Sequence, residues 1–87
     1  MRLQIDRFHV GQSVSFKKHI GASELAQFVE LTGDDNPLHV DHEYAKNTEM
    51  RKTVVHGMLT VSFISTLIGK HLPGPGALWV SQTIDFL

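Results

Sequence analysis

The sequence contains no cysteine and has no excess of charge of either sign. Without thiols, the chain can form neither disulfides nor thiolate zinc sites. Eight Lys and Arg residues stand against nine Asp and Glu residues, so there is no basic excess of the kind that attracts nucleic acid. Residues 1–6 mix charged and polar side chains and show no apolar signal-peptide core. These absences predict a cytoplasmic protein that does not bind nucleic acid.

Long hydrophobic runs are also missing, with one exception between Gly57 and His71. There the apolar residues are interrupted mainly by small Ser and Thr residues, a pattern typical of a helix buried inside a protein. A helix of this length is ~22 Å long, too short to cross a bilayer. The run stops at Leu72-Pro73-Gly74-Pro75-Gly76. The sequence thus predicts a central apolar helix and no membrane span.

Shorter patterns predict extended segments on both sides of this helix. Residues 1–20 are expected to be extended, and residues 78–86 alternate apolar and polar side chains as a strand does. An apolar helix needs a sheet around it, and the chain supplies only two or three strands. With 87 residues, the chain is long enough for one domain at most. We therefore expect a single α+β domain over residues 1–87 that is an incomplete, N-terminal portion.

Two further helices are indicated by their capping residues. Ser23 is expected to be the N-cap of a helix that ends at Thr32, where Gly33 supplies the C-terminal stop. Asp41 is expected to cap a short helix over residues 42–46. Between the two helices lies a polar loop that is stiffened by proline.

That loop, Thr32-Gly33-Asp34-Asp35-Asn36-Pro37-Leu38-His39, carries the strongest chemical signal. Pro37 keeps Asn36 extended, and Asn36 is expected to shape the turn with its side chain. Asp34 and His39 can converge on one small molecule such as water. An unperturbed Asp has a pKa near ~3.9 and an unperturbed His near ~6.5, so the pair can exchange protons at neutral pH. Without a nucleophilic Cys or a Ser in a sharp elbow, addition or removal of water is favoured over acyl-enzyme chemistry.

A second signal is His56-Gly57 at the start of the apolar helix. Backbone N–H groups at a helix N-terminus can stabilise negative charge that develops on a carbonyl oxygen. We therefore place Gly57 at an oxyanion and substrate site, with Asn36 and His56 beside it. His56 is expected to orient this site rather than to transfer protons.

A metal site is the alternative for His39-Val40-Asp41-His42, because zinc accepts imidazole and carboxylate ligands. Asp41 as a helix cap and His42 as an exposed first-turn residue explain the same segment without an ion. No metal is predicted.

These motifs together resemble the MaoC-like, (R)-specific enoyl-CoA hydratases. The resemblance runs from about Val10 to Leu87 and rests on Thr32-Gly33-Asp34-x-Asn36-Pro37-Leu38-His39-x5-Ala45, Val55-His56-Gly57-Met58-Leu59, Leu72-Pro73-Gly74-Pro75-Gly76 and Gln82. It implies a hotdog fold, in which an antiparallel sheet wraps around a long central helix, and a homodimer. Because the family's domain continues through further strands, it also implies that the C-terminal strands are missing here.

The same resemblance implies the chemistry. Asp34 and His39 match the catalytic pair, which holds the water that adds across a trans-2-enoyl thioester, and the Gly57 N–H matches the donor to the thioester oxygen. No metal or prosthetic group is used, because CoA belongs to the substrate. The predicted function is reversible hydration of trans-2-enoyl-CoA to (R)-3-hydroxyacyl-CoA. The alternatives are a hotdog thioesterase, an acyl-carrier-protein dehydratase, a non-catalytic acyl-CoA binding or interaction fragment, and a small histidine-rich metal binder.

Overall fold

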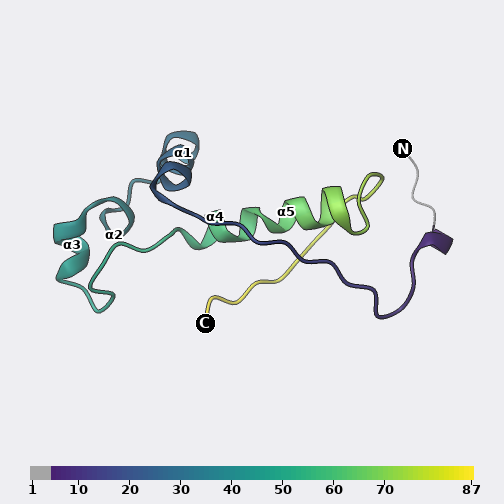
Figure 1. The fold of residues 1–87 in the computed structure, drawn as a ribbon. Coiled ribbons are helices and arrows are strands. Elements are labelled where there is room, and N and C mark those ends of the chain that lie inside the picture. The colour runs from purple at the N-terminus through teal and green to yellow at the C-terminus, as the bar shows by residue number, and fades with distance from the viewer. Residues whose placement is uncertain (1–4) are drawn as a thin grey trace. The chain divides into compact units, whose positions relative to one another are not determined.

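The computed structural model describes residues 5–87, and these residues form short helices but no β-strand (Figure 1). The strands predicted within residues 5–20 and 78–86 are therefore not present in the described part of the chain. A strand exists only where its backbone is paired with a neighbour, and these segments have no ladder partner. Residues 1–4, the start of the segment predicted to be extended, lie outside the described residues. A short 3₁₀ turn, η1 (Ile5–Arg7), follows them.

Helix α1 (Ala22–Thr32) begins two residues earlier than predicted. Its N-cap is Gly21, whose N–H donates to Glu24 Oε1 at 2.8 Å. The prediction of Ser23 as the cap is wrong, because Ser23 already lies inside the helix, where its hydroxyl oxygen accepts from Gln27. The carboxylate of Glu24 takes the place of a capping side chain by binding the backbone N–H of the cap residue.

The end of α1 follows the prediction. Gly33 has a φ of 79°, in the left-handed region that glycine enters without steric cost, and its N–H donates to the Val29 carbonyl at 2.7 Å. The chain therefore turns sharply at Gly33 and starts the motif segment there.

The loop predicted after Gly33 contains one helical turn, α2 (Pro37–Val40). Asn36 is its N-cap, with its side-chain oxygen accepting from the Leu38 N–H at 3.0 Å, and Pro37 is the first helical residue. The predicted extended conformation of Asn36 is confirmed by its φ of −48° and ψ of 128°. The assignment of residues 37–39 to a loop is wrong, because a cap followed by proline starts a helix locally.

Helix α3 (His42–Lys46) has the predicted bounds. The Asp41 carboxylate accepts from the N–H groups of Glu43 and Tyr44 at 3.0 and 3.1 Å. Ala45 is fully buried on this helix. The predicted cap is confirmed.

The predicted helix over residues 57–71 is confirmed as helical, but in three pieces. They are α4 (Gly57–Ser62), α5 (Ile64–Thr66) and a π-helical turn, η2 (Leu67–His71). The prediction of a buried helix is wrong for the described residues: Leu59 is buried, but 60% of Met58 is exposed. The physical reason is that the sheet expected to cover these side chains is not present among residues 5–87.

The described residues fall into two compact units. One holds the residues up to Lys18 together with Val61–Leu87. Within it the Phe16 and His71 rings lie 5.9 Å apart, and Lys18 Nζ lies 5.8 Å from the Phe63 ring centre. The prediction of one domain over residues 1–87 stays a prediction.

The other unit, His19–Thr60, contains α1, α2 and α3 and every candidate site residue. Over residues 5–87, no helix combines the length and the hydropathy that a membrane span requires.

Candidate active site

Asp34 is held in a hydrogen-bonded turn directly after α1. The Thr32 hydroxyl donates to the Phe28 carbonyl at 2.7 Å and accepts from the Asp34 N–H at 3.2 Å. The Asn36 N–H then donates to Asp34 Oδ1 at 3.3 Å. The turn fixes the backbone at Asp34 while the residue stays exposed. A carboxylate in this position is both oriented and open to water.

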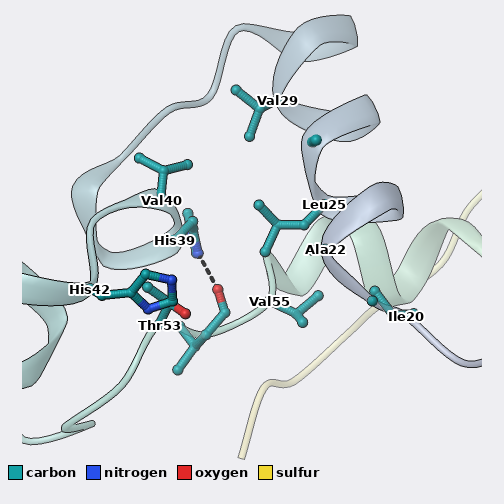
Figure 2. A pocket seen from close by; sticks show the side chains of 12 residues that line it. Ile20, Ala22, Leu25, Val29, His39, Val40, His42, Thr53 and Val55 are labelled. Carbon is teal, nitrogen blue, oxygen red and sulfur yellow. Dashed lines mark hydrogen bonds between the residues drawn. The ribbon is translucent and has the colours of Figure 1, made fainter.

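His39, on α2, is oriented by a segment that follows much later in the sequence. Its Nδ1 lies 2.7 Å from the Val54 carbonyl oxygen, a contact drawn as the dashed line in Figure 2. The Val54 N–H donates to the Leu38 carbonyl at 3.2 Å. A carbonyl can only accept, so Nδ1 carries the hydrogen. In the neutral ring, Nε2 then has the free lone pair. His39 can accept a proton or a hydrogen bond through that atom.

His56 is the most buried of the candidate residues, with 2% of its surface exposed. Its Nε2 donates to the backbone carbonyl of Asp34 at 2.9 Å. Its ring stacks on the His39 ring with centres 3.8 Å apart, and it packs against Phe28 at 4.8 Å. His56 therefore contacts both Asp34 and His39.

The three side chains converge. One ligand atom from each of Asp34, His39 and His56 lies within 4.8 Å of the others. A water molecule that makes hydrogen bonds of about 2.8 Å can bridge a carboxylate oxygen and an imidazole nitrogen at this separation. The structure thus brings together the two side chains that were predicted to share a water.

The same three residues are of the types that bind zinc, so their fit to an ion can be tested on geometry. A metal lies about 2 Å from each ligand nitrogen and close to the plane of each imidazole. The His39 and His56 rings are only 26° from parallel and stacked on one another, so both cannot aim at one ion without turning. In the other candidate segment, the Asp41 carboxylate caps α3. The arrangement fits water better than a metal.

The remaining predicted residues lie next to this cluster in the chain. Gly57 follows His56 directly and is the first residue of α4, so its own N–H precedes the first hydrogen-bonded turn, in which the Leu59 and Thr60 N–H groups donate to the His56 carbonyl. Asn36 lies two residues after Asp34, but its side-chain oxygen is used in capping α2. Its position at the site is therefore explained by the turn that it stabilises.

A pocket of about 520 Å³ adjoins His39. Figure 2 shows that side chains from α1, α2 and the segment 53–55 surround it. Most of them are apolar, namely Ile20, Ala22, Leu25, Ala26, Val29, Val40, Val54 and Val55, while His39, His42 and Thr53 add polar groups. The pocket can hold an apolar group with one end close to the His39 imidazole.

Sequence reasoning missed the pocket and the contacts of His56 and Phe28. The apolar face of α1, with Leu25, Phe28 and Val29, was visible as a spacing, but the spacing does not say what the face covers. It covers the pocket and the buried imidazole.

These observations describe one site, in which a carboxylate and two imidazoles converge beside a largely apolar pocket. The MaoC like domain family matches residues 7–87. The chain belongs to that family.

Relatives agree with this assignment. The (R)-specific enoyl-CoA hydratase of Rhodospirillum rubrum is 45% identical over 76 residues, covering 87% of this chain and 53% of that protein. The 3-hydroxybutyryl-CoA dehydratase of Methylorubrum extorquens is 39% identical over 84 residues, covering 97% and 54%.

Among solved structures, an (R)-hydratase from A. caviae involved in PHA biosynthesis aligns with a TM-score of 0.86 at 41% identity, covering 92% of this chain and 61% of that one. The chain shares the hydratase fold over the aligned part, which supports the hotdog assignment at the level of the fold family. It spans about half the length of the curated relatives that it matches.

Proposed function

We propose that the protein is an (R)-specific enoyl-CoA hydratase, which adds water reversibly to trans-2-enoyl-CoA. The observation that carries the proposal is the convergence of Asp34 and His39 within 4.8 Å in a family of hydratases and dehydratases. No nucleophilic side chain is needed, because water itself is the nucleophile: the reaction forms a C–O bond and a C–H bond and releases no group.

In the proposed mechanism, one water lies between the two side chains. One of its O–H groups donates to the Asp34 carboxylate and the other to His39 Nε2, the nitrogen left free by the bond from Nδ1 to Val54. Asp34 acts as the base while the water oxygen attacks C3. The proton that Asp34 takes from the water reaches C2 either directly or after transfer to His39 Nε2, so the two steps together add one molecule of water and return both side chains to their starting states.

The thioester carbonyl gains negative charge as C3 is attacked. The N–H of Gly57, at the start of α4, is the proposed donor to that oxygen. This assignment is supported by the resemblance of Val55-His56-Gly57 to the family motif and by the bonding of His56 to Asp34.

The acyl chain is proposed to enter the apolar pocket. Its walls come from α1, α2 and residues 53–55, and the His39 imidazole lies in the wall (Figure 2). An acyl group bound there has its reacting carbons close to the imidazole and its tail among Leu25, Val29 and Val55. Burial of the tail stabilises the complex by roughly 0.8 kcal/mol per methylene.

The sheet of the hotdog fold is likewise a proposal. We propose that the segments around 14–18 and 78–86 pair with strands of the full natural chain and that this chain forms a homodimer. The support is the similarity to relatives of whose length this chain spans little more than half, together with the exposure of Leu78 and Val80, at 86% and 85%. The cytoplasmic location and the lack of any metal or prosthetic group stay predictions.

The test uses the full natural chain with Asp34→Asn and His39→Gln made separately. Each variant keeps the size and some hydrogen bonding of the original side chain but loses its proton-transfer chemistry. We expect hydration of crotonyl-CoA to fall by on the order of 10²–10⁴ in each. Asp35→Asn is the matched control, because the Asp35 carboxylate has no predicted role, and it should keep nearly full activity.

The rival activities give different readouts in the same assay. A thioesterase would release free CoA thiol, and a dehydratase of acyl-carrier-protein substrates would turn over the carrier-bound thioester in preference to the CoA ester. Near-normal hydration by Asp34→Asn or His39→Gln would exclude the proposed mechanism.

A further inference from the structure

His56 is buried and yet makes only part of the hydrogen bonding that an imidazole can make. Its Nε2 donates to the Asp34 carbonyl, but its Nδ1 is buried with no hydrogen-bond partner among the described residues. A buried polar atom left unpaired costs about 1–3 kcal/mol. A Gln or Asn could donate the same bond without a ring. We therefore look for contacts of the ring itself that offset the free-energy cost of the unpaired nitrogen.

The His56 ring contacts two other aromatic rings. The His56 imidazole stacks on His39 at 3.8 Å and packs against Phe28 on α1 at 4.8 Å. His39 is also held by its bond to the Val54 carbonyl. With the Val54 bond alone, the His39 ring could still tilt about the hydrogen bond. The stacked His56 ring restricts this motion. Val54 and His56 together thus set the orientation of the His39 ring and the direction of its Nε2 lone pair.

The hydrogen bond of His56 acts on the other partner. Its N–H binds the backbone carbonyl of Asp34, in the turn that also holds the carboxylate through the Asn36 N–H. His56 lies 22 positions after Asp34 in the sequence, so this bond joins the residue before α4 to the turn that follows α1. A single side chain therefore fixes the backbone of the carboxylate and the ring plane of the imidazole.

We propose that His56 is a positioning residue, which sets the separation and orientation of Asp34 and His39 through one hydrogen bond and one stacked ring. The inference rests on the proposed function of that pair. Because the reacting atoms must be aligned closely, loosening either contact lowers the rate of the chemical step more than it weakens substrate binding. His56 itself exchanges no proton with the substrate.

Three substitutions in the full natural chain separate the two contacts. His56→Gln keeps an N–H donor for the Asp34 carbonyl but removes the stacked ring. His56→Phe keeps the ring but removes the donor, and His56→Ala removes both. We expect kcat for crotonyl-CoA hydration to fall about 10-fold in each of the first two and about 100-fold in the third, with KM changed less than about 3-fold. His9→Gln, at an exposed histidine in the other unit, is the matched control.

A role in stability alone is distinguished by combining variants. If His56 acts through the pair, adding His56→Phe to Asp34→Asn should lower the remaining rate less than about 2-fold, because the carboxylate that it positions is already lost. The same holds for His56→Gln in His39→Gln. Full multiplication of the two effects would overturn the proposal, as would loss of folding in all three single variants.

A readout that needs no activity separates this proposal from the proposed function. The ¹⁵N shifts of the His39 ring should report one neutral tautomer, with hydrogen on Nδ1, in the unsubstituted protein, and a mixture of tautomers in His56→Ala. If the unsubstituted protein shows no hydration, the proposed function fails. If hydration is present and the His56 variants keep full kcat and one His39 tautomer, only the positioning role fails.

Discussion

Backbone carbonyls orient both imidazoles of the candidate site. His39 Nδ1 donates to the carbonyl of Val54, and His56 Nε2 donates to that of Asp34. The two rings thus present different nitrogens: His39 has Nε2 free to meet a water, while the free Nδ1 of His56 is buried. Two residues of the same type therefore have different roles: His39 can bind a water through its free Nε2, whereas His56 holds the backbone of Asp34.

Asn36 gives a prediction at this scale, since its side chain, which was placed at the substrate site and was also expected to shape the turn, caps α2. Replacing it by Ala should lower the free energy of unfolding of the full natural chain by about 1 kcal/mol, because the Leu38 N–H loses its acceptor. Asn36→Asp keeps a capping oxygen and should restore stability and most of the hydration rate. Urea unfolding and crotonyl-CoA hydration measure the two. Restored stability without restored hydration would instead assign the amide to the substrate.

Only part of this residue-level picture was accessible from sequence. The acid and the histidine lie five positions apart across a proline, so their proximity is a local property of one turn. His56 and Phe28 reach the same place from other elements, and no local pattern encodes a contact over such a distance. The prediction that His56 has no proton-transfer role stays a prediction, while its contacts with Asp34 and His39 are new information.

At the scale of elements, predictions succeeded where the stop or start signal is local. Gly33 ends α1 and Asp41 starts α3 because each acts on N–H or carbonyl groups within four residues. Ser23 failed as a cap because Gly21, two residues earlier, already had the carboxylate of Glu24 as its partner. Strands need a partner from elsewhere, and their prediction from alternation alone was not met within residues 5–87.

A comparison of two glycines measures how much stability depends on the left-handed conformation at the end of α1. A Cβ added at Gly33 or at Gly69 meets nothing within 4 Å, but only Gly33 has a positive φ, of 79°. Gly33→Ala should therefore destabilise the full natural chain by about 1–2 kcal/mol, whereas Gly69→Ala should be neutral or stabilising. Thermal unfolding of the two variants provides the comparison. Equal melting temperatures would mean that the left-handed turn before Asp34 is not required.

At the scale of the whole molecule, the exposed apolar residues are the main feature to explain. Only Ala45 and Leu59 form the buried apolar core among the described residues, while Val80, Leu78 and Phe86 are 85%, 86% and 63% exposed. The burial predicted from sequence assumed a covering sheet. Local helices form without that sheet because their caps and turns are satisfied locally, but a core requires the layers that pack against it.

The proposed sheet makes a prediction that uses the lack of cysteine in this sequence. If residues 78–86 pair as a strand in the full natural chain, alternate side chains point to opposite faces. Val80→Cys should then react slowly with iodoacetamide, because it lies on the face that covers the helix, and Ser81→Cys should react quickly on the opposite face. Mass spectrometry of the peptide assigns the label to its position. Equal, rapid labelling at both positions would show that the segment stays extended and unpaired, as in the described residues, and would remove the sheet from the proposed fold.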